Sequence, residues 1–288
     1  MTMDEAPAAG EATAGEATAG ADRRPPFDTS VANQARIYDY LLGGKDNYAA
    51  DRAAVDAVLK VAPHLGFTAR ANRAFLGRAV RYLTAEAGIR QFLDIGTGIP
   101  TAGNTHQVAQ ATAPETRVVY VDYDPIVLAH ARALLTSHQA GATEYIDADL
   151  RDTGTILSQA ARLLDFSEPV AVTMLMILHV IPDSDDPYGA VARVMDAMPP
   201  GSYLAFSHLG AELLAGEARQ GFDNVVNRSA QQQYIGRSRE ELARFFTGMD
   251  LIEPGLVRVE QWRPDPDPDG AAETGTSALW CAVARKTG

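Results

Sequence analysis

A short apolar run that ends in an acidic residue and two glycines carries the clearest chemical signal in the chain. Residues 92–98 read FLDIGTG, which predicts a strand followed by a tight turn. Glycine lets a chain turn sharply and lets a ligand approach the backbone closely. Ligands of parallel α/β sheets bind beside the carboxyl ends of the strands. We therefore predict a ligand-binding turn at Asp94, Gly96, Thr97 and Gly98.

The same turn departs from a pyrophosphate-binding fingerprint. That fingerprint requires a third glycine three residues after the second, and the residue at this position is Thr101. Asp94 would repel a pyrophosphate, whereas it suits a cationic ligand that carries an amino-acid group. An ordinary strand-to-helix turn is the alternative, and the missing glycine argues against a nicotinamide-dependent oxidoreductase.

Two further predicted strands also end in acidic residues. Residues 117–124 (RVVYVDYD) and 142–149 (ATEYIDAD) place Asp122, Asp124 and Asp149 near their ends. Because strand side chains alternate in direction, we assign Asp122 to ribose hydroxyls and Asp124 to a helix cap. Asp149 could accept a hydrogen bond from an adenine amino group. Each aspartate alone is explained by capping or solvation, but three successive acidic strand ends favour one shared adenosyl ligand.

These candidate residues require a sheet that brings its strand ends together. After residue 90, short apolar runs alternate with helical runs, which predicts an α/β fold with parallel strands and right-handed crossovers. We predict strands at 91–96, 117–124, 142–149, 169–178 and 202–209, with helices at 102–112, 125–136, 153–164 and 188–197. Two final apolar runs, at 256–262 and 277–286, predict an antiparallel hairpin at one edge.

The chain before residue 90 divides into two parts. Residues 1–26 repeat GEATA and hold few large apolar residues, so we expect a disordered low-complexity tail, with an interaction arm as the alternative. Residues 27–89 predict a cover of three helices, the first capped by one of residues 28–30. A ligand-binding domain follows at 90–288.

A glycine pair in this cover is followed by a polar stretch, which gives GGKDN at residues 43–47. Polar and aromatic side chains are dense around it, and such a loop can fold over a ligand. The candidate lid residues are Tyr38, Tyr40, Lys45, Asn47 and Tyr48. Amphipathic packing of the tyrosines beside a plain turn is the alternative.

Composition narrows the classes of partner and compartment. The formal net charge is −12 and no basic patch stands out, so the phosphate-neutralising cations of a nucleic-acid binder are missing. One cysteine excludes an intramolecular disulfide and suits a reducing compartment. No apolar run approaches the roughly 20 residues that span a bilayer, and the first residues lack a signal-peptide pattern. We expect a cytoplasmic protein that binds neither nucleic acid nor membrane.

The motifs together resemble those of a known enzyme class. The segments FLDIGTG, VVYVDYDP, DADLRD and MILHVIPD resemble motifs one to four of class I S-adenosylmethionine-dependent methyltransferases. NQARIYDYLLGGKDNYAADR resembles the actinobacterial S-adenosyl methyltransferase family, once a domain of unknown function. The resemblance covers residues 27–288. It implies a Rossmann-like, mostly parallel seven-stranded sheet with an antiparallel edge hairpin and an N-terminal helical cover, and S-adenosyl-L-methionine as the cofactor.

The resemblance also implies roles for individual residues. Contacts with the methionine end of the cofactor are implied for Asp94, Gly96 and Gly98, and contact with the ribose for Asp122. Tyr123 would lie beside the adenine, while Asp149 and the Leu150 backbone would read its edge. The donor side would be lined by residues 176–179, which begin with Met176. Pro100 stands where the general pattern often has a third glycine, which leaves the backbone path of the turn open.

Methyl transfer sets modest demands on the protein. The sulfonium methyl group is already electrophilic, so catalysis rests on alignment of the reactants and exclusion of water. A general base is needed only when the acceptor must lose a proton. His179 is the first candidate and His208 the second, with backbone-bonded strand-end histidines as the alternative. No metal is required. We expect a small-molecule acceptor, a non-catalytic cofactor-binding regulator as the alternative, and a homodimer as an open possibility.

Overall fold

The computed structural model describes residues 28–134, 137–214, 219–220, 234–266 and 274–288. The predicted tail at residues 1–26 lies outside these ranges. None of the helices in the described ranges combines the length and the apolar character needed to cross a bilayer.

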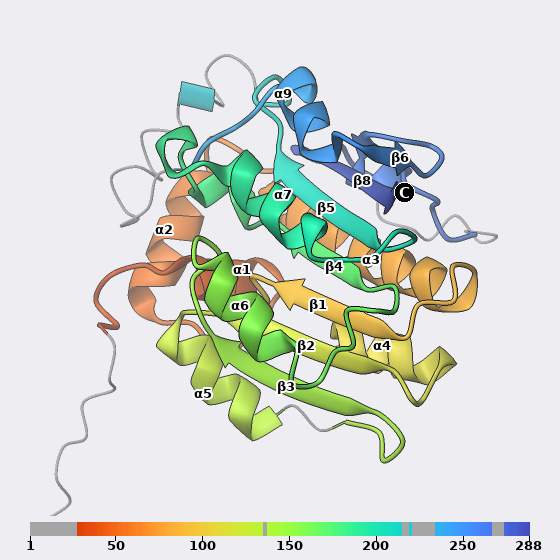
Figure 1. Cartoon of the computed structure of the whole chain (residues 1–288). Helices are drawn as coiled ribbons and strands as arrows, with labels where there is room; N and C mark the ends of the chain where they lie inside the picture. Colours follow the sequence, from red (N-terminus) through yellow and green to blue (C-terminus); the bar gives the residue numbers. More distant parts are fainter. Residues whose placement is uncertain (1–27, 135–136, 215–218, 221–233, 267–273) are drawn as a thin grey trace, which may run out of the picture.

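Within the described residues, eight strands form one mixed sheet (Figure 1). Its order is β3-β2-β1-β4-β5-β8-β6, and β7 also pairs with β8. The strands are β1 Gln91–Ile95, β2 Arg117–Asp122, β3 Ala142–Asp147, β4 Ala171–Leu175, β5 Tyr203–Leu209, β6 Met249–Leu251, β7 Val257–Arg258 and β8 Leu279–Lys286. The first five strands are parallel, and β8 runs antiparallel between β5 and β6. The predicted α/β class and the mostly parallel sheet are confirmed.

The predicted antiparallel pairing at the edge is present between β7 and β8, but it is shorter than expected. β7 has only two residues, and a 3-10 turn follows it at Val259–Gln261. The guanidinium of Arg78, a buried arginine, donates to the carbonyls of Val259 and Trp262 at 2.5 and 2.9 Å. Those carbonyls are therefore turned away from strand pairing. β6, which the sequence analysis did not predict, pairs with the last residues of β8, Ala284 to Lys286.

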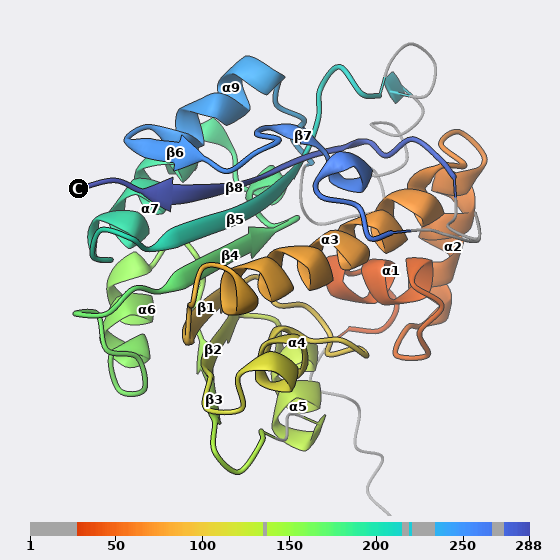
Figure 2. The same cartoon turned by 90° about the vertical axis from the view of Figure 1, so that its right-hand side faces the viewer.

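Helices cover both faces of the sheet. They are α1 Gln34–Leu41, α2 Ala49–Leu59, α3 Leu65–Ala85, α4 Thr105–Thr112, α5 Pro125–Leu134, α6 Thr153–Ala160, α7 Pro187–Asp196 and α9 Arg239–Ala243. One core cluster packs α6 and α7 against the sheet, and another packs α3 and α4 against the opposite face. Figure 2 shows these two layers on either side of the strands.

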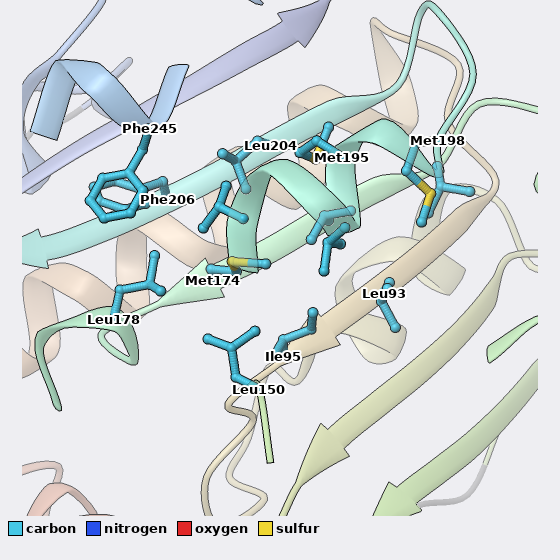
Figure 3. Close-up of a cluster of buried hydrophobic side chains, with 14 of the residues drawn as sticks. Leu93, Ile95, Leu150, Met174, Leu178, Met195, Met198, Leu204, Phe206 and Phe245 are labelled. Carbon is cyan, nitrogen blue, oxygen red and sulfur yellow. The ribbon is translucent and has the colours of Figure 1, made fainter. Parts of the chain in front are cut away.

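Alternation along β1 explains how one strand serves both layers. Phe92 packs with the α3 side, whereas Leu93 and Ile95 pack with the α7 side. Figure 3 shows Leu93 and Ile95 in the cluster that also holds Met174 and Phe206. With both faces buried, β1 is apolar apart from Gln91 at its start and Asp94 near its end, whose carboxylate must therefore be held by other groups.

The first helix starts later than predicted. Its cap is Asn33, whose Oδ1 accepts from the Ala35 and Arg36 amides at 2.8 and 3.4 Å. Asp28 instead accepts from the amide and hydroxyl of Ser30, so it forms a local turn and does not cap the helix. This shift lets Asn33 contact Asp124 after β2 and Gln34 contact Met176 after β4. Both contacts lie at the carboxyl ends of the strands, near which Figure 1 shows α1 and α2.

Candidate functional site

A cavity of about 400 Å³ lies where the N-terminal helices meet the carboxyl ends of β1, β2 and β4. Its polar wall includes four residues of the predicted site: Asp94, Gly96, Gly98 and Asp122. The opposite wall comes from α1, α2 and α3. The structure thus brings the first two acidic strand ends and the glycine turn to one enclosed space.

The two glycines of the β1 turn have different reasons to be glycine. Both have left-handed backbones, with φ of 78° at Gly96 and 67° at Gly98. A Cβ on Gly96 would lie 2.6 Å from the side chain of Ile177, so the close packing at that position leaves no room for a larger residue. A Cβ on Gly98 would meet nothing within 4 Å. Gly98 therefore leaves room for a ligand against the backbone, although the third glycine is absent.

Asp122 joins the glycine turn to β2. Its Oδ2 accepts from the Gly98 amide at 2.9 Å and its Oδ1 accepts from the Asp124 amide at 3.0 Å. Burial raises the pKa of Asp122 above its ordinary value. Asp124 caps α5 by accepting from the Ile126 amide, as predicted, but it also lines the cavity and accepts from Asn33 Nδ2 at 2.6 Å. Both acids of the pair therefore border the cavity, whereas we predicted one.

Asp94 is fixed from the other side of the turn. Its Oδ2 accepts from the Thr105 hydroxyl at 2.6 Å, and burial raises its pKa. Arg73 of α3 also lines the cavity. Its Nη2 donates to the Ala102 carbonyl and to Asn104 Oδ1, while its buried Nε has no hydrogen-bond partner among the described residues. An acid and a half-buried cation thus share one end of the cavity.

The turn after β4 forms the next part of the wall. Met176 has φ of 51°, an uncommon conformation for a residue with a side chain. Its amide donates to the Ser207 carbonyl and hydroxyl at 3.0 and 3.1 Å, and its carbonyl accepts from Gln34 Nε2 at 3.3 Å. Such strain persists where neighbours over-determine it, often at functional sites.

His179 is fully buried and lines the cavity. Its Nε2 lies 3.3 Å from Gln34 Nε2. The same Gln34 nitrogen contacts the Met176 carbonyl and must be the amide NH₂ group, so we assign His179 Nε2 as the acceptor and place the ring proton on Nδ1. That Nδ1 has no partner in the described part of the chain. Burial, reinforced by Arg237, lowers the pKa of His179 to about 3.

His208 does not belong to the cavity wall, contrary to the prediction. Both of its ring nitrogens are engaged, Nδ1 with the Leu209 carbonyl and Nε2 with Arg237 Nη1, each at 2.8 Å. Since an arginine can only donate, Nε2 is the acceptor and the ring is neutral. Burial lowers the pKa of His208 well below its ordinary value. The residue joins β5 to the segment that contains Arg237.

Only one of the predicted lid residues reaches the cavity. Tyr38 lines it, donates its hydroxyl hydrogen to the Ala69 carbonyl at 3.1 Å and accepts from Asn72 Nδ2 at 2.9 Å. The GGKDN loop does not fold over the cavity. The Asp39 carboxylate holds the loop beside α1 by accepting hydrogen bonds from the Asp46 amide and Asn47 Nδ2. The predicted lid residues that lie outside the wall are Tyr40, Lys45, Asn47 and Tyr48.

The predicted adenine-binding residues are divided by the structure. Tyr123 lines the cavity and is 43% exposed. Asp149 lies outside the wall, because both of its carboxylate oxygens accept from the Arg151 side chain, at 2.6 and 2.9 Å. Leu150 packs in the core on the α7 face. Thr97 is also outside the wall and donates its hydroxyl to the Asp94 carbonyl at 3.2 Å.

The polar wall residues that the sequence analysis missed include Asn33, Gln34 and Arg73. Asn33 is a recognisable helix cap, but nothing local shows that its amide reaches Asp124. For Arg73 a signal exists, because it adjoins the residues of α3 that line the cavity at helical spacing, which are Leu65, Thr68, Asn72 and Leu76.

The sheet order, the glycine turn after β1 and the acids at the ends of β1 and β2 define a Rossmann-like methyltransferase. The chain belongs to the S-adenosyl methyltransferase family, whose model matches residues 20–287. It is therefore a methyltransferase that uses S-adenosyl-L-methionine, and the predicted family, reaction and cofactor are confirmed.

Solved structures agree with this assignment. A DUF574 family protein from Streptomyces avermitilis is 45% identical, with a TM-score of 0.85 over 90% of this chain and 99% of that protein. A candidate methyltransferase from Thermobifida fusca is 40% identical, with a TM-score of 0.82 over 93% and 100%. The plantazolicin methyltransferase BpumL shares the fold alone, at 10% identity and a TM-score of 0.53 over 88% and 96%. The comparison with curated proteins gives no match.

Proposed function

We propose that this enzyme transfers the methyl group of S-adenosyl-L-methionine to a small molecule held in the same cavity. The observation that carries the proposal is the extent of the cavity. It runs from Gly98 and Asp122, past Met176 and His179, to the wall formed by α2 and α3. A cofactor at the glycine turn would leave the part beneath the helices for an acceptor.

The residues of the polar wall fit the charges of the cofactor. Buried carboxylates on Asp94 and Asp122 favour a cationic ligand, and the open side of Gly98 allows close approach. We assign Asp122 to the ribose hydroxyls and Asp94 to the amino group of the methionine moiety. The unpaired Nε of Arg73 is suited to bind the carboxylate of the methionine moiety. Tyr123 would then lie beside the adenine.

The cofactor supplies an electrophilic methyl group when bound, and the protein holds the reactants in position. Gln34 ties α1 to the β4 turn through the Met176 carbonyl and His179 Nε2. Ser207 holds the strained Met176 backbone in place. Together these contacts fix the wall beside the acceptor, which keeps the reactants aligned.

His179 changes role in this account. We predicted a general base, but a group with a pKa of about 3 holds a proton too weakly to take one from an acceptor near pH 7. A nearby sulfonium cation would lower that pKa further. We therefore propose that His179 shapes the wall as a neutral imidazole, and that the acceptor reacts without proton transfer to it.

The experiment is methyl transfer from isotope-labelled cofactor to the organic-soluble and aqueous fractions of a metabolite extract. Transfer by the wild-type enzyme and its loss in Asp122→Asn are expected. Asp147→Asn is the matched control, because Asp147 is exposed at the end of the neighbouring strand and pairs in register with Asp122. Normal cofactor binding without transfer to any fraction would instead indicate the regulatory alternative.

A further inference from the structure

The helical side of the cavity is an apolar chamber. We define the acceptor chamber by Ile37 and Leu41 of α1, Val55 and Leu59 of α2, and Leu65 and Leu76 of α3. All six line the cavity that also contains the glycine turn. The chamber is therefore continuous with the cofactor side and has a hydrocarbon surface.

Charged side chains of the cavity wall lie elsewhere or are paired. The contribution of α2 to the wall is entirely apolar. Arg36 of α1 lies 3.0 Å from Asp51 in an ion pair in which both side chains are almost fully buried. Asp94 and Asp122 belong to the cofactor side. A charged group inside the chamber would lose its hydration without a counter-charge, which is strongly unfavourable.

The polar side chains of Tyr38, Thr68 and Asn72, which line the cavity on this side, are hydrogen-bonded to other protein groups. Ser207 donates to Asn72 Oδ1 at 2.7 Å, Asn72 donates to the Tyr38 hydroxyl, and Tyr38 donates to the Ala69 carbonyl. Thr68 accepts from the Ala278 amide at 3.2 Å. Each of these polar groups already has a protein partner, so the chamber offers a ligand mainly shape and apolar contact.

An unpaired ring nitrogen lies at the boundary between the chamber and the cofactor side. His179 is neutral there, and its Nδ1 has no hydrogen-bond partner among the residues described. A single heteroatom of a ligand at this point would be oriented while the rest of the ligand stays in apolar surroundings. The wall thus fits a molecule with one polar end.

We propose that the methyl acceptor is an uncharged, largely apolar molecule with a single nucleophilic heteroatom, whose apolar body fills the acceptor chamber. This inference rests on the proposed function. The heteroatom forms the new bond to the methyl carbon as the carbon–sulfur bond breaks, and the electron pair of that bond stays on sulfur. A proton on the heteroatom leaves to water.

The test measures binding in the absence of turnover. The enzyme is saturated with S-adenosylhomocysteine and titrated calorimetrically with 2-naphthol, and in parallel with 2-naphthol-6-sulfonate, which adds one negative charge to the same rings. We expect 2-naphthol to bind at least tenfold more tightly than the sulfonate. Equal or tighter binding of the sulfonate, or no binding of 2-naphthol, would overturn the proposal.

Two variants locate the binding site on α2. Leu59→Asp places a carboxylate in the chamber and should weaken 2-naphthol binding at least tenfold. Ala53→Asp places the same group on the exposed face of that helix and should leave binding unchanged. Both variants should keep the wild-type affinity for S-adenosylhomocysteine, which shows that they are folded. Unchanged 2-naphthol affinity in Leu59→Asp would place the ligand elsewhere and contradict the proposal.

The outcomes also separate this inference from the function on which it rests. Selective 2-naphthol binding without methyl transfer to any extract fraction would leave the chamber in place and remove the enzymatic role. Methyl transfer confined to charged metabolites would keep the function and overturn the acceptor class.

Discussion

Replacing Asp122 by asparagine perturbs the cofactor site at its best-defined point. The carboxylate accepts from the amides of Gly98 and Asp124, at 2.9 and 3.0 Å. Asparagine keeps one acceptor oxygen, but its NH₂ group must face one of these two amide donors. The variant therefore loses the negative charge, one acceptor and one bond that holds the glycine turn.

The magnitude follows from the worth of these bonds. A hydrogen bond to a charged group contributes roughly 1.5–3 kcal/mol, and each 1.4 kcal/mol is about a factor of ten in affinity. Losing about 2–3 kcal/mol from the ribose contact would weaken cofactor binding roughly 30- to 150-fold. The unsatisfied amide lowers the free energy of unfolding by only about 1–2 kcal/mol, because the asparagine is also cheaper to bury than the carboxylate.

Calorimetric titration with S-adenosylhomocysteine measures the affinity without turnover, and urea unfolding measures the stability. Asp147→Asn is the control and should match the wild type in affinity, since Asp147 lies outside the cavity wall. An Asp122→Asn protein that folds and binds with wild-type affinity would refute the assignment of the ribose to this carboxylate.

Three further predictions concern other parts of the wall. Burial raises the pKa values of Asp94 and Asp122, and a cationic ligand favours their ionised forms. Cofactor affinity measured by calorimetry should therefore be constant near pH 7 and fall as the pH is lowered through those raised pKa values. An affinity that increases on acidification would contradict this prediction. His179 has a pKa of about 3, so the pH–rate profile should lack an inflection from this histidine between pH 5 and 8, and an inflection there that disappears in His179→Asn would show that the imidazole titrates during catalysis. Gly96→Ala should destabilise the protein by at least about 1–2 kcal/mol, because alanine disfavours the left-handed backbone of this position. The close contact of the new Cβ with Ile177 should add to this loss. Unfolding at the wild-type urea midpoint would disprove the steric argument.

Features encoded locally were the ones that sequence reasoning predicted well. The strands β1 to β5 follow from apolar periodicity, and the turn at Gly96 and Gly98 follows from backbone freedom. The cap formed by Asp124 could be named because a helix start is a local pattern. Asp94 and Asp122 were placed together since parallel strands share one edge for their carboxyl ends.

Features that depend on a particular side-chain partner were missed or misassigned. Gln34 reaches His179 across 145 positions of the chain, and no local pattern encodes that contact. Asp149 was expected at the adenine, but its neighbour Arg151 binds the carboxylate instead. The GGKDN loop was expected over the ligand, yet hydrogen bonds to Asp39 hold it outside the cavity wall. In each case a side-chain partner, absent from the pattern of residue types, decided the outcome.

The structure of the enzyme crystallised with S-adenosylhomocysteine and 2-naphthol tests the central claim most directly. We expect the ribose on Asp122, the methionine carboxylate near Arg73, and the sulfur directed past Met176 toward the rings of 2-naphthol in the acceptor chamber. A cofactor product whose sulfur points away from the chamber, or a chamber closed to 2-naphthol, would contradict it.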